Sequence, residues 1–472
     1  MAMRRVDASD VKIGLKIKRD GSYVENKEGS NDLALLVKAA FITESIGQAT
    51  LEGEFVLEDA SGLISTLNGS EIWELKLETV HKKATYKLRA YTISDRVRAG
   101  NVEAYTVKCV SDEFLKNEVL SIFGNTKTLF DNKVEAENII ETLLEDSKYL
   151  NTPKKLHTEK TLNKHVFVAS NWRIFDMIYW IAKRTVRATG GGAKDSKQNG
   201  FLFWENIMGY HFKSIDKMID DVNQQSFEEE TDINGGKAKL YEYTYAPKKS
   251  GDEANDDMKI EGIVFPADRD YLTGLRQGAW SGFSVGFDPN MFANGKISKD
   301  MLTATHAHEY DISEFWGKMS HVGKSTSKNP VETYDEDIKK LIQNPKRIRY
   351  DFLPNRMYDR PRWKVGSFTF GGTVREESKN YDEIPYLQSY QHLRVQSLKN
   401  VQLLVVVPGN LDLYSGYGVE IRIPKTKPVG SRMETDYKYS GRYVISGIRH
   451  KYTDETLYTE LMLVRDSVPL PK

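Results

Sequence analysis

The sequence has a single cysteine, Cys109, so no intrachain disulfide can form and stability must come from packing or from assembly. It has no net charge, because 67 basic residues balance 67 acidic ones, and this argues against a dedicated nucleic-acid-binding protein. It also has no run of about 18 apolar residues, the length that a membrane span requires. The N-terminal MAMRRVDASDVKIG lacks the apolar segment of a secretory signal, so we expect a protein made and folded in a cytoplasm.

Motifs that carry catalysis are equally scarce. The sequence contains no G-x-S-x-G nucleophile elbow. The glycine-rich ATGGGAKDSKQ follows a predicted helix and precedes a predicted hairpin, which is the wrong order for a phosphate-binding loop. Cys109 lies among apolar residues of a predicted strand, which indicates a packed thiol instead of a reactive one. These patterns favour an assembly component over an enzyme, and we predict no catalytic residue, no cofactor-binding residue and no cofactor.

The segment THAHEYD, residues 305–311, has a histidine spacing that could bind a metal. In a strand, His306 and His308 would face the same side, as two ligands of one metal could, whereas Glu309 would point away. His321 lies nearby in the sequence. Because a metal site needs three or four converging ligands, we predict two surface or interface histidines and no metal site. A metal-dependent hydrolase that uses His306 and His308 is the alternative from a different functional class.

A first β-barrel is predicted over residues 1–110. The chain length of 472 residues predicts two to four domains. The first 110 residues contain short β-rich stretches separated by glycine and asparagine turns, which is typical of an antiparallel barrel. In SEIWELKLE, Trp73, Leu75 and Leu77 alternate with other residues, and this period of two places them toward the core.

A mixed α/β domain with helices and a hairpin is predicted over residues 111–259. The stretch SDEFLKNEVLSIFG predicts a helix that ends at Gly124. The strongest helical pattern covers residues 172–187, with Ser170 or Asn171 as its cap. Its wide apolar face, formed by Ile174, Phe175, Ile178, Ile181 and Ala182, should be buried.

A second barrel is predicted from residues 260–312 and 393–472, interrupted by an insertion with a helix and loops over residues 313–392. Within the mixed domain that precedes this barrel, FLFWENIMGYHFKSID predicts a hairpin. The acidic, polar residues 223–257 predict mostly solvated loop.

Two hairpin patterns suggest that one barrel design is used twice. Ile93–Ser94 and Tyr105–Thr106 in the first barrel resemble Ile445–Ser446 and Tyr458–Thr459 near the end of the chain. Short alternating strands also resemble one another by chance, so the residues alone leave a true repeat and a coincidence both open.

Four blocks of the chain resemble a known family. They are NWRIFDMIYWIAKRTV, FLFWENIMGYHFKSID, LRVQSLKNVQLLVVVPGNLDLYSGYGVEIRIP, and GRYVISGIRHKY with LYTELMLVRDS. In content and order they resemble the baseplate hub protein of contractile-tailed phages, the T-even type. The most specific block is the one that contains PGN and VEIRIP. The blocks cover less than a third of the chain, and residues 223–257 and 313–381 match nothing in that family.

The resemblance implies an α+β, mainly β fold, in which two tube-protein-like antiparallel β-barrels are joined by a mixed helical domain. It implies a homotrimer whose six barrels form a pseudo-six-fold ring at the distal end of the tail of a virion. That ring would adapt the six-fold tail tube to the three-fold central spike and would form part of the DNA exit channel. The implied partners are the tail tube or a tube-initiator protein, the spike protein, other baseplate proteins and DNA in transit. The hub of a non-viral contractile injection machine is a related alternative.

Overall fold

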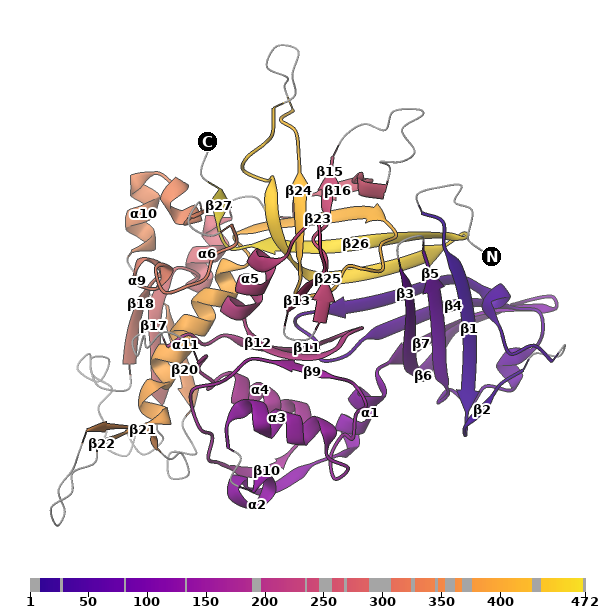
Figure 1. Ribbon diagram of the computed structural model, residues 1–472, viewed down its shortest axis with the longest axis horizontal. Helices are drawn as coiled ribbons and strands as arrows, with labels where there is room; N and C mark the ends of the chain where they lie inside the picture. Colours follow the sequence, from indigo (N-terminus) through magenta and orange to yellow (C-terminus); the bar gives the residue numbers. More distant parts are fainter. Residues whose placement is uncertain are drawn as a thin grey trace.

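The structure is a computed structural model of the chain. It describes residues 9–25, 29–79, 82–131, 134–188, 197–233, 236–245, 257–266, 270–287, 307–323, 327–343, 347–352, 361–366, 376–426 and 434–469. One continuous sheet of 13 strands runs through two β-barrels, and helices and smaller sheets pack beside it (Figure 1). The predicted fold class, mainly β with two antiparallel barrels and a mixed helical part, is confirmed.

The first barrel uses the strands near the N-terminus. They are β1 (Lys12–Arg19), β2 (Ser22–Tyr23), β3 (Val37–Ser45), β4 (Glu52–Asp59), β5 (Ile72–Glu78), β6 (Lys83–Ala99) and β7 (Val102–Val110), with short 3-10 helices η1 (Ala34–Leu36) and η2 (Leu63–Ser65). The strands pair in the order β3-β4-β7-β6-β5-β1. The backbone N–H of Leu33, just before β3, donates to the carbonyl of Leu15 in β1 at 2.8 Å. That hydrogen bond connects the β3 end of this strand order to β1 at its other end.

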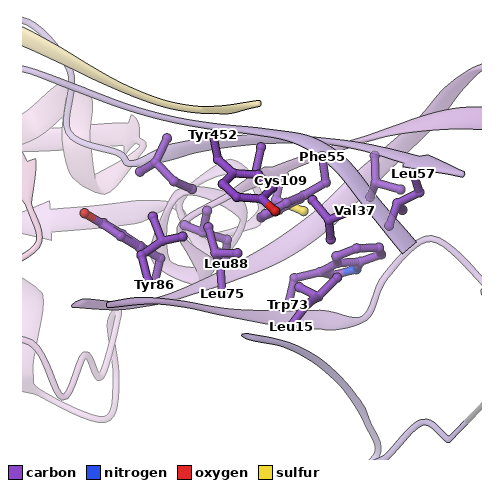
Figure 2. Packing of buried hydrophobic residues seen from close by; sticks show 14 of the residues in the cluster. Leu15, Val37, Phe55, Leu57, Trp73, Leu75, Tyr86, Leu88, Cys109 and Tyr452 are labelled. Carbon is purple, nitrogen blue, oxygen red and sulfur yellow. The ribbon is translucent and has the colours of Figure 1, made fainter. Parts of the chain in front are cut away.

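The core of the first barrel follows from strict alternation along its strands. Trp73, Leu75 and Leu77 in β5 are all buried, as predicted, and Phe55 of β4 stacks on Trp73 with ring centroids 5.3 Å apart (Figure 2). Two residues from the far end of the chain, Tyr452 and Leu457, belong to the same core cluster. The first barrel therefore depends on a hairpin of the second for part of its interior.

The second barrel is assembled from distant segments. Its strands are β15 (Glu242–Thr244), β16 (Gly262–Val264), β23 (Val401–Pro408), β24 (Gly418–Arg422), β25 (Gly441–Thr453) and β26 (Thr456–Arg465), in the order β16-β23-β26-β25-β24-β15. The backbone N–H of Ile260, before β16, donates to the carbonyl of Thr244 in β15 at 3.1 Å, which joins the ends of this order too. Strand β15 lies within residues 223–257, so that segment contributes to a barrel as well as to loops.

Both barrels have the same strand order when their strands are matched in chain order, leaving aside the two-residue β2, which pairs only with β1. The first strand of each lies at one end of the order and the second at the other, and the last two form the central hairpin. One difference is that β1 runs antiparallel to β5, whereas β15 runs parallel to β24. Each central hairpin has a two-residue turn, because Ala99 pairs with Val102 and Thr453 with Thr456. The two modules are therefore repeats in topology.

The predicted register of the repeat is wrong on both strands of the hairpin. On the first strand Ile93 corresponds to Ile448 instead of Ile445, because their partners Val107 and Leu461 are equivalent, and on the last strand the match is wrong by one residue. Counted from the two turns, residues 102–110 correspond to 456–464, so Tyr105 matches Thr459 instead of Tyr458. Burial agrees with the ladders, since Tyr105 and Thr459 are both buried, whereas Tyr458 is only half-buried. A one-residue slip exchanges the two faces of a strand, and matching by residue letters did not detect it.

The mixed region between the barrels contains a helical layer and two small sheets. Its elements are α1 (Asp112–Val119), β8 (Ile122–Asn125), α2 (Thr126–Phe130), α3 (Ala136–Glu145), β9 (Leu156–Thr158), β10 (Val168–Trp172), α4 (Ile174–Ala182), β11 (Phe201–Asn206), β12 (Gly209–Ser214) and α5 (Ile215–Gln224). The predicted hairpin is confirmed, with Phe203 opposite Phe212. The helix predicted to reach Gly124 ends at Val119, because residues 122–125 pair with β10.

The helix predicted over residues 172–187 is shorter than expected. Ser170 and Trp172 pair with β8, and Arg173 stands at the N-cap of α4. Ser170 and Asn171 therefore end a strand instead of capping the helix. The predicted apolar face is buried in full, and it packs in one cluster with α3 and the β11–β12 hairpin.

Residues 281–287 and 307–311, predicted to belong to the second barrel, form strands of a separate sheet instead. This sheet has the order β18-β17-β20, with β17 (Ser281–Phe287), β18 (Ala307–Asp311) and β20 (Ile348–Phe352). The barrel needs no strand from here, because β15 and β16 occupy the two ends of its order. The long helix α11 (Asn380–Ser397), which begins within the predicted insertion, contacts all three strands.

The remaining elements are short and lie outside the 13-stranded sheet. They are β13 (Thr231–Ile233), β14 (Gly236–Ala238), α6 (Tyr271–Gln277), α9 (Ile312–Trp316), β19 (Ser327–Lys328), η5 (Pro330–Thr333), α10 (Glu336–Ile342), β21 (Pro361–Gly366), β22 (Glu376–Lys379) and β27 (Val468–Pro469). No helix in the described ranges is both long enough and apolar enough to cross a membrane.

Candidate functional site

The feature that organises the molecule is the junction between the two barrels. Strand β25 pairs with β24 of its own barrel over Gly441–Val444, and then pairs with β3 of the first barrel over Gly447–Thr453. The change of partner coincides with a β-bulge between Ile445 and Gly447. Bulges bend a strand and increase its local twist, so this one turns β25 out of its own barrel and along the edge of the other.

Side chains reinforce the junction on both sides of the new ladder. The hydroxyl of Ser45 donates to the carbonyl of Ser446 at 3.2 Å. The guanidinium of Arg449 lies over the ring of Phe41, 4.4 Å from its centroid. A cation over an aromatic face is stabilised by the quadrupole of the ring. The two barrels are therefore joined by a hydrogen-bonded sheet and do not merely touch.

Glu44 ties three parts of the chain together at this junction. Its carboxylate accepts the backbone N–H of Ser415 at 2.8 Å, from the second barrel, and that of Ile207 at 3.3 Å, from the β11–β12 turn. The side chain is buried. Burial raises the pKa of Glu44 to about 8, although both backbone hydrogen bonds act in the opposite direction.

A buried ionic cluster anchors the end of the second barrel to the helices. Arg394 of α11 lies between two buried carboxylates, with Nη1 at 2.8 Å from Asp466 and Nε at 3.2 Å from Asp216. His321 Nδ1 lies 2.9 Å from Asp466, and the hydroxyl of Tyr390 donates to Asp216 at 2.8 Å. The cluster thus joins α5, α11, the segment after α9 and the residue that follows β26.

Charge complementarity sets the ionisation of this cluster. Burial alone would raise the pKa of Asp466, but Arg394 and His321 outweigh it and lower the pKa to about 2. Burial acts to lower the pKa of Arg394, and the two carboxylates raise it above its ordinary value. All three side chains of the Asp216–Arg394–Asp466 group are fully buried, so each charge depends on the others for compensation.

The histidines of THAHEYD do not form a metal centre among the residues that the structure describes. His306 lies outside those residues. His308, in β18, contacts the hydroxyl of Ser389 through Nδ1 at 3.2 Å and stacks on Phe315. His321 belongs to the ionic cluster. In the described ranges, no three His, Cys, Asp or Glu side chains are grouped as a metal would require.

Sequence reasoning missed both the junction and the ionic cluster. Neither has a local signal, because Glu44 and Ser415 are 371 residues apart and Arg394 and Asp466 are 72 apart. A usable hint was the length of β25, whose 13 residues extend well beyond the segment Gly441–Val444 that pairs with β24.

Comparison with known proteins reveals a shared fold. No protein-family model and no curated protein match the sequence. Among solved structures, the 43 kDa tail protein of prophage MuSo2 from Shewanella oneidensis superposes with a TM-score of 0.50 at 9% identity, over 96% of this chain and 99% of that one. A tail protein from Neisseria meningitidis MC58 gives a TM-score of 0.49 at 10% identity, over 97% of each chain. Over 96% of its length the chain therefore shares its fold with the prophage MuSo2 tail protein.

Proposed function

We propose that this chain is the structural hub of a phage tail baseplate. Three copies form a ring of six barrels, which joins a six-fold tail tube to a three-fold central spike and leaves a channel for DNA. The observation that carries the proposal is the presence of two barrels of the same strand order, joined edge to edge, in one chain. The fold shared with a phage tail protein supports it.

Symmetry explains why a duplicated barrel suits this role. A six-fold tube and a three-fold spike cannot meet through identical contacts, but a closed cyclic trimer of double barrels presents six similar units to one side and three chains to the other. The balanced net charge suits a conduit, because a strongly basic channel would bind the phosphates of the passing DNA. The hub would lie at the distal end of the tail, between the tube or its initiator and the spike, with other baseplate proteins around it.

The test is the mass and shape of the purified chain. Sedimentation should show a species of three chain masses, and end-on electron micrographs should show six densities around a central hole. A chain that stays monomeric at high concentration, even with the spike protein present, would refute the proposal.

We propose a structural role without catalysis for the same chain. His308 packs between Ser389 and Phe315, which is the environment of a structural side chain. Metal analysis of the purified protein tests this directly. Stoichiometric zinc that is lost in His308→Ala, together with a hydrolytic activity, would refute it.

A further inference from the structure

The junction inside one chain supplies a template for a contact between chains. Strand β25 corresponds to β6, since each is the first strand of the central hairpin of its barrel. Each carries a bulge midway, between Ile445 and Gly447 in β25 and between Ala90 and Thr92 in β6, and β6 has a second bulge between Ser94 and Val97, just before the three residues nearest the turn. Before its bulge, β6 pairs with β5 of its own barrel, as β25 pairs with β24. The two strands are therefore built alike up to this point.

After the bulge the two strands differ. The second half of β25 pairs with β3 of the other barrel. The second half of β6, from Thr92 to Ala99, pairs with β7 on one side and with no described strand on the other. Val97 on this half is 64% exposed. The second half of β6 thus has an unused edge where β25 has a partner.

The matching acceptor is also unused. Strand β3, which receives β25, corresponds to β16, because each is the second strand of its barrel and pairs antiparallel with the third. Strand β16 pairs with β23 on one side and has no partner among the described strands on the other. Val264 at its end is 57% exposed. Among the described strands, the first barrel therefore has an unpaired donor edge on the second half of β6, and the second barrel has an unpaired acceptor edge on β16 at the end of the continuous sheet.

We propose that β6 of one copy pairs antiparallel with β16 of a second copy of this chain, as β25 pairs with β3 within the chain. The internal ladder fixes the register. Within the chain, Lys451 pairs with Phe41. Lys451 corresponds to Val97, because the two residues occupy equivalent positions in the central hairpins. Phe41 corresponds to Val264, because their pairing partners on β4 and β23 occupy equivalent positions. Val97 of one copy therefore lies directly opposite Val264 of the next, and Arg98 lies opposite Ile263.

Physical chemistry favours this pairing. An unpaired strand edge exposes backbone donors and acceptors and is a site of aggregation unless something covers it. The pairing satisfies those groups and covers two large exposed apolar side chains. Each copy uses its donor edge on one neighbour and its acceptor edge on the other, so the contact is heterologous and closes into a ring when the rotation per copy divides a full turn. The number of copies, three, rests on the proposed function.

Cysteine crosslinking tests the register. The native Cys109 is buried in the first barrel, with an exposed fraction of 1%. Two variants, Val97→Cys and Val264→Cys, are mixed and oxidised, and the products are separated by mass. We expect a covalent dimer from the mixture and none from either variant alone. The control replaces Val264→Cys by Val119→Cys, at a residue of α1 that is 82% exposed, and should give no dimer with Val97→Cys.

A charge placed on the edge supplies a second readout. Val264→Lys should shift the sedimenting species from the assembled form to the monomer, because a lysine on an edge strand opposes strand addition, whereas Val119→Lys should leave assembly unchanged. Thermal unfolding of both variants shows that they are folded. A trimer that forms without the crosslink and tolerates Val264→Lys would overturn this pairing and leave the hub function standing. A wild-type chain that remains monomeric would overturn both.

Discussion

Replacing Arg394 tests whether the buried ionic cluster depends on its cation. In Arg394→Met, Asp216 and Asp466 keep their positions but lose their shared partner. Breaking a buried ion pair by removing one member costs about 3–5 kcal/mol, because it leaves an uncompensated buried charge. We therefore expect the free energy of unfolding to fall by about that amount.

The chain offers a matched control in Arg173. This arginine also contacts two carboxylates, Glu118 at 2.7 Å and Asp176 at 2.8 Å, but all three side chains are about half exposed. Exposed ion pairs contribute about 0–1 kcal/mol, so Arg173→Met should have little effect. Urea unfolding followed by tryptophan fluorescence provides the measurement, and Trp316, stacked on His321 at 3.8 Å, lies beside the cluster.

The pH dependence of the Arg394→Met defect gives an independent check. Asp466 has a folded pKa of about 2, below its ordinary value of 3.8, so its contribution to stability is present above pH 3.8 and is lost as the pH falls to about 2. Without Arg394 the carboxylate should protonate more easily. The difference in free energy of unfolding between wild type and Arg394→Met should therefore shrink as the pH falls. Equal losses for the two arginine variants at neutral pH, or a difference that grows at low pH, would refute the reasoning.

Two further predictions concern the helical core and the barrel junction. Phe175→Ala should lower the free energy of unfolding by about 2–5 kcal/mol, because the side chain is buried in the core of the mixed region. The same change at Phe123, which is 78% exposed, should cost less than about 0.5 kcal/mol in the same urea titration. Glu44 has its pKa raised to about 8. Its contribution to the free energy of unfolding is therefore complete below pH 4.5 and declines by about 1.4 kcal/mol per pH unit as the pH rises to about 8. Glu44→Gln should remove that decline, and parallel melting profiles of variant and wild type between pH 5 and 9 would contradict the assignment.

Local patterns predicted the elements of this fold well wherever one face is buried. The alternation around Trp73 and the apolar face around Phe175 place the same residues in the core that the structure does. Helix boundaries were less predictable. Ser170 and Asn171 are good cap residues by type, yet pairing with β8 takes that segment into a strand, because tertiary partners outweigh local preference.

Long-range assembly could not be predicted in the same way. The stretches around Phe283 and Tyr310 are correctly predicted as β, but a strand pattern does not specify its partner, and they join a separate sheet. The three-residue strand β15 is too short to show any period. The junction at Glu44 depends on residues hundreds of positions apart. Composition and resemblance pointed toward an assembly component, but the edges that such an assembly would use emerge only from the ladders.

The hydrogen bond between Ser45 and Ser446 spans 401 residues of sequence, and this has a consequence for synthesis. A ribosome adding about 5–20 residues per second needs about 20–80 s to make the intervening chain. During that interval β3 lacks its second neighbour, and the first core lacks Tyr452 and Leu457. We expect a chain truncated after Ser440 to aggregate or to be degraded, and a soluble, protease-resistant truncated chain would contradict this. The first barrel to leave the ribosome is thus the one that must wait for the end of translation, and the nascent chain has to be kept apart from its neighbours until its last hairpin arrives.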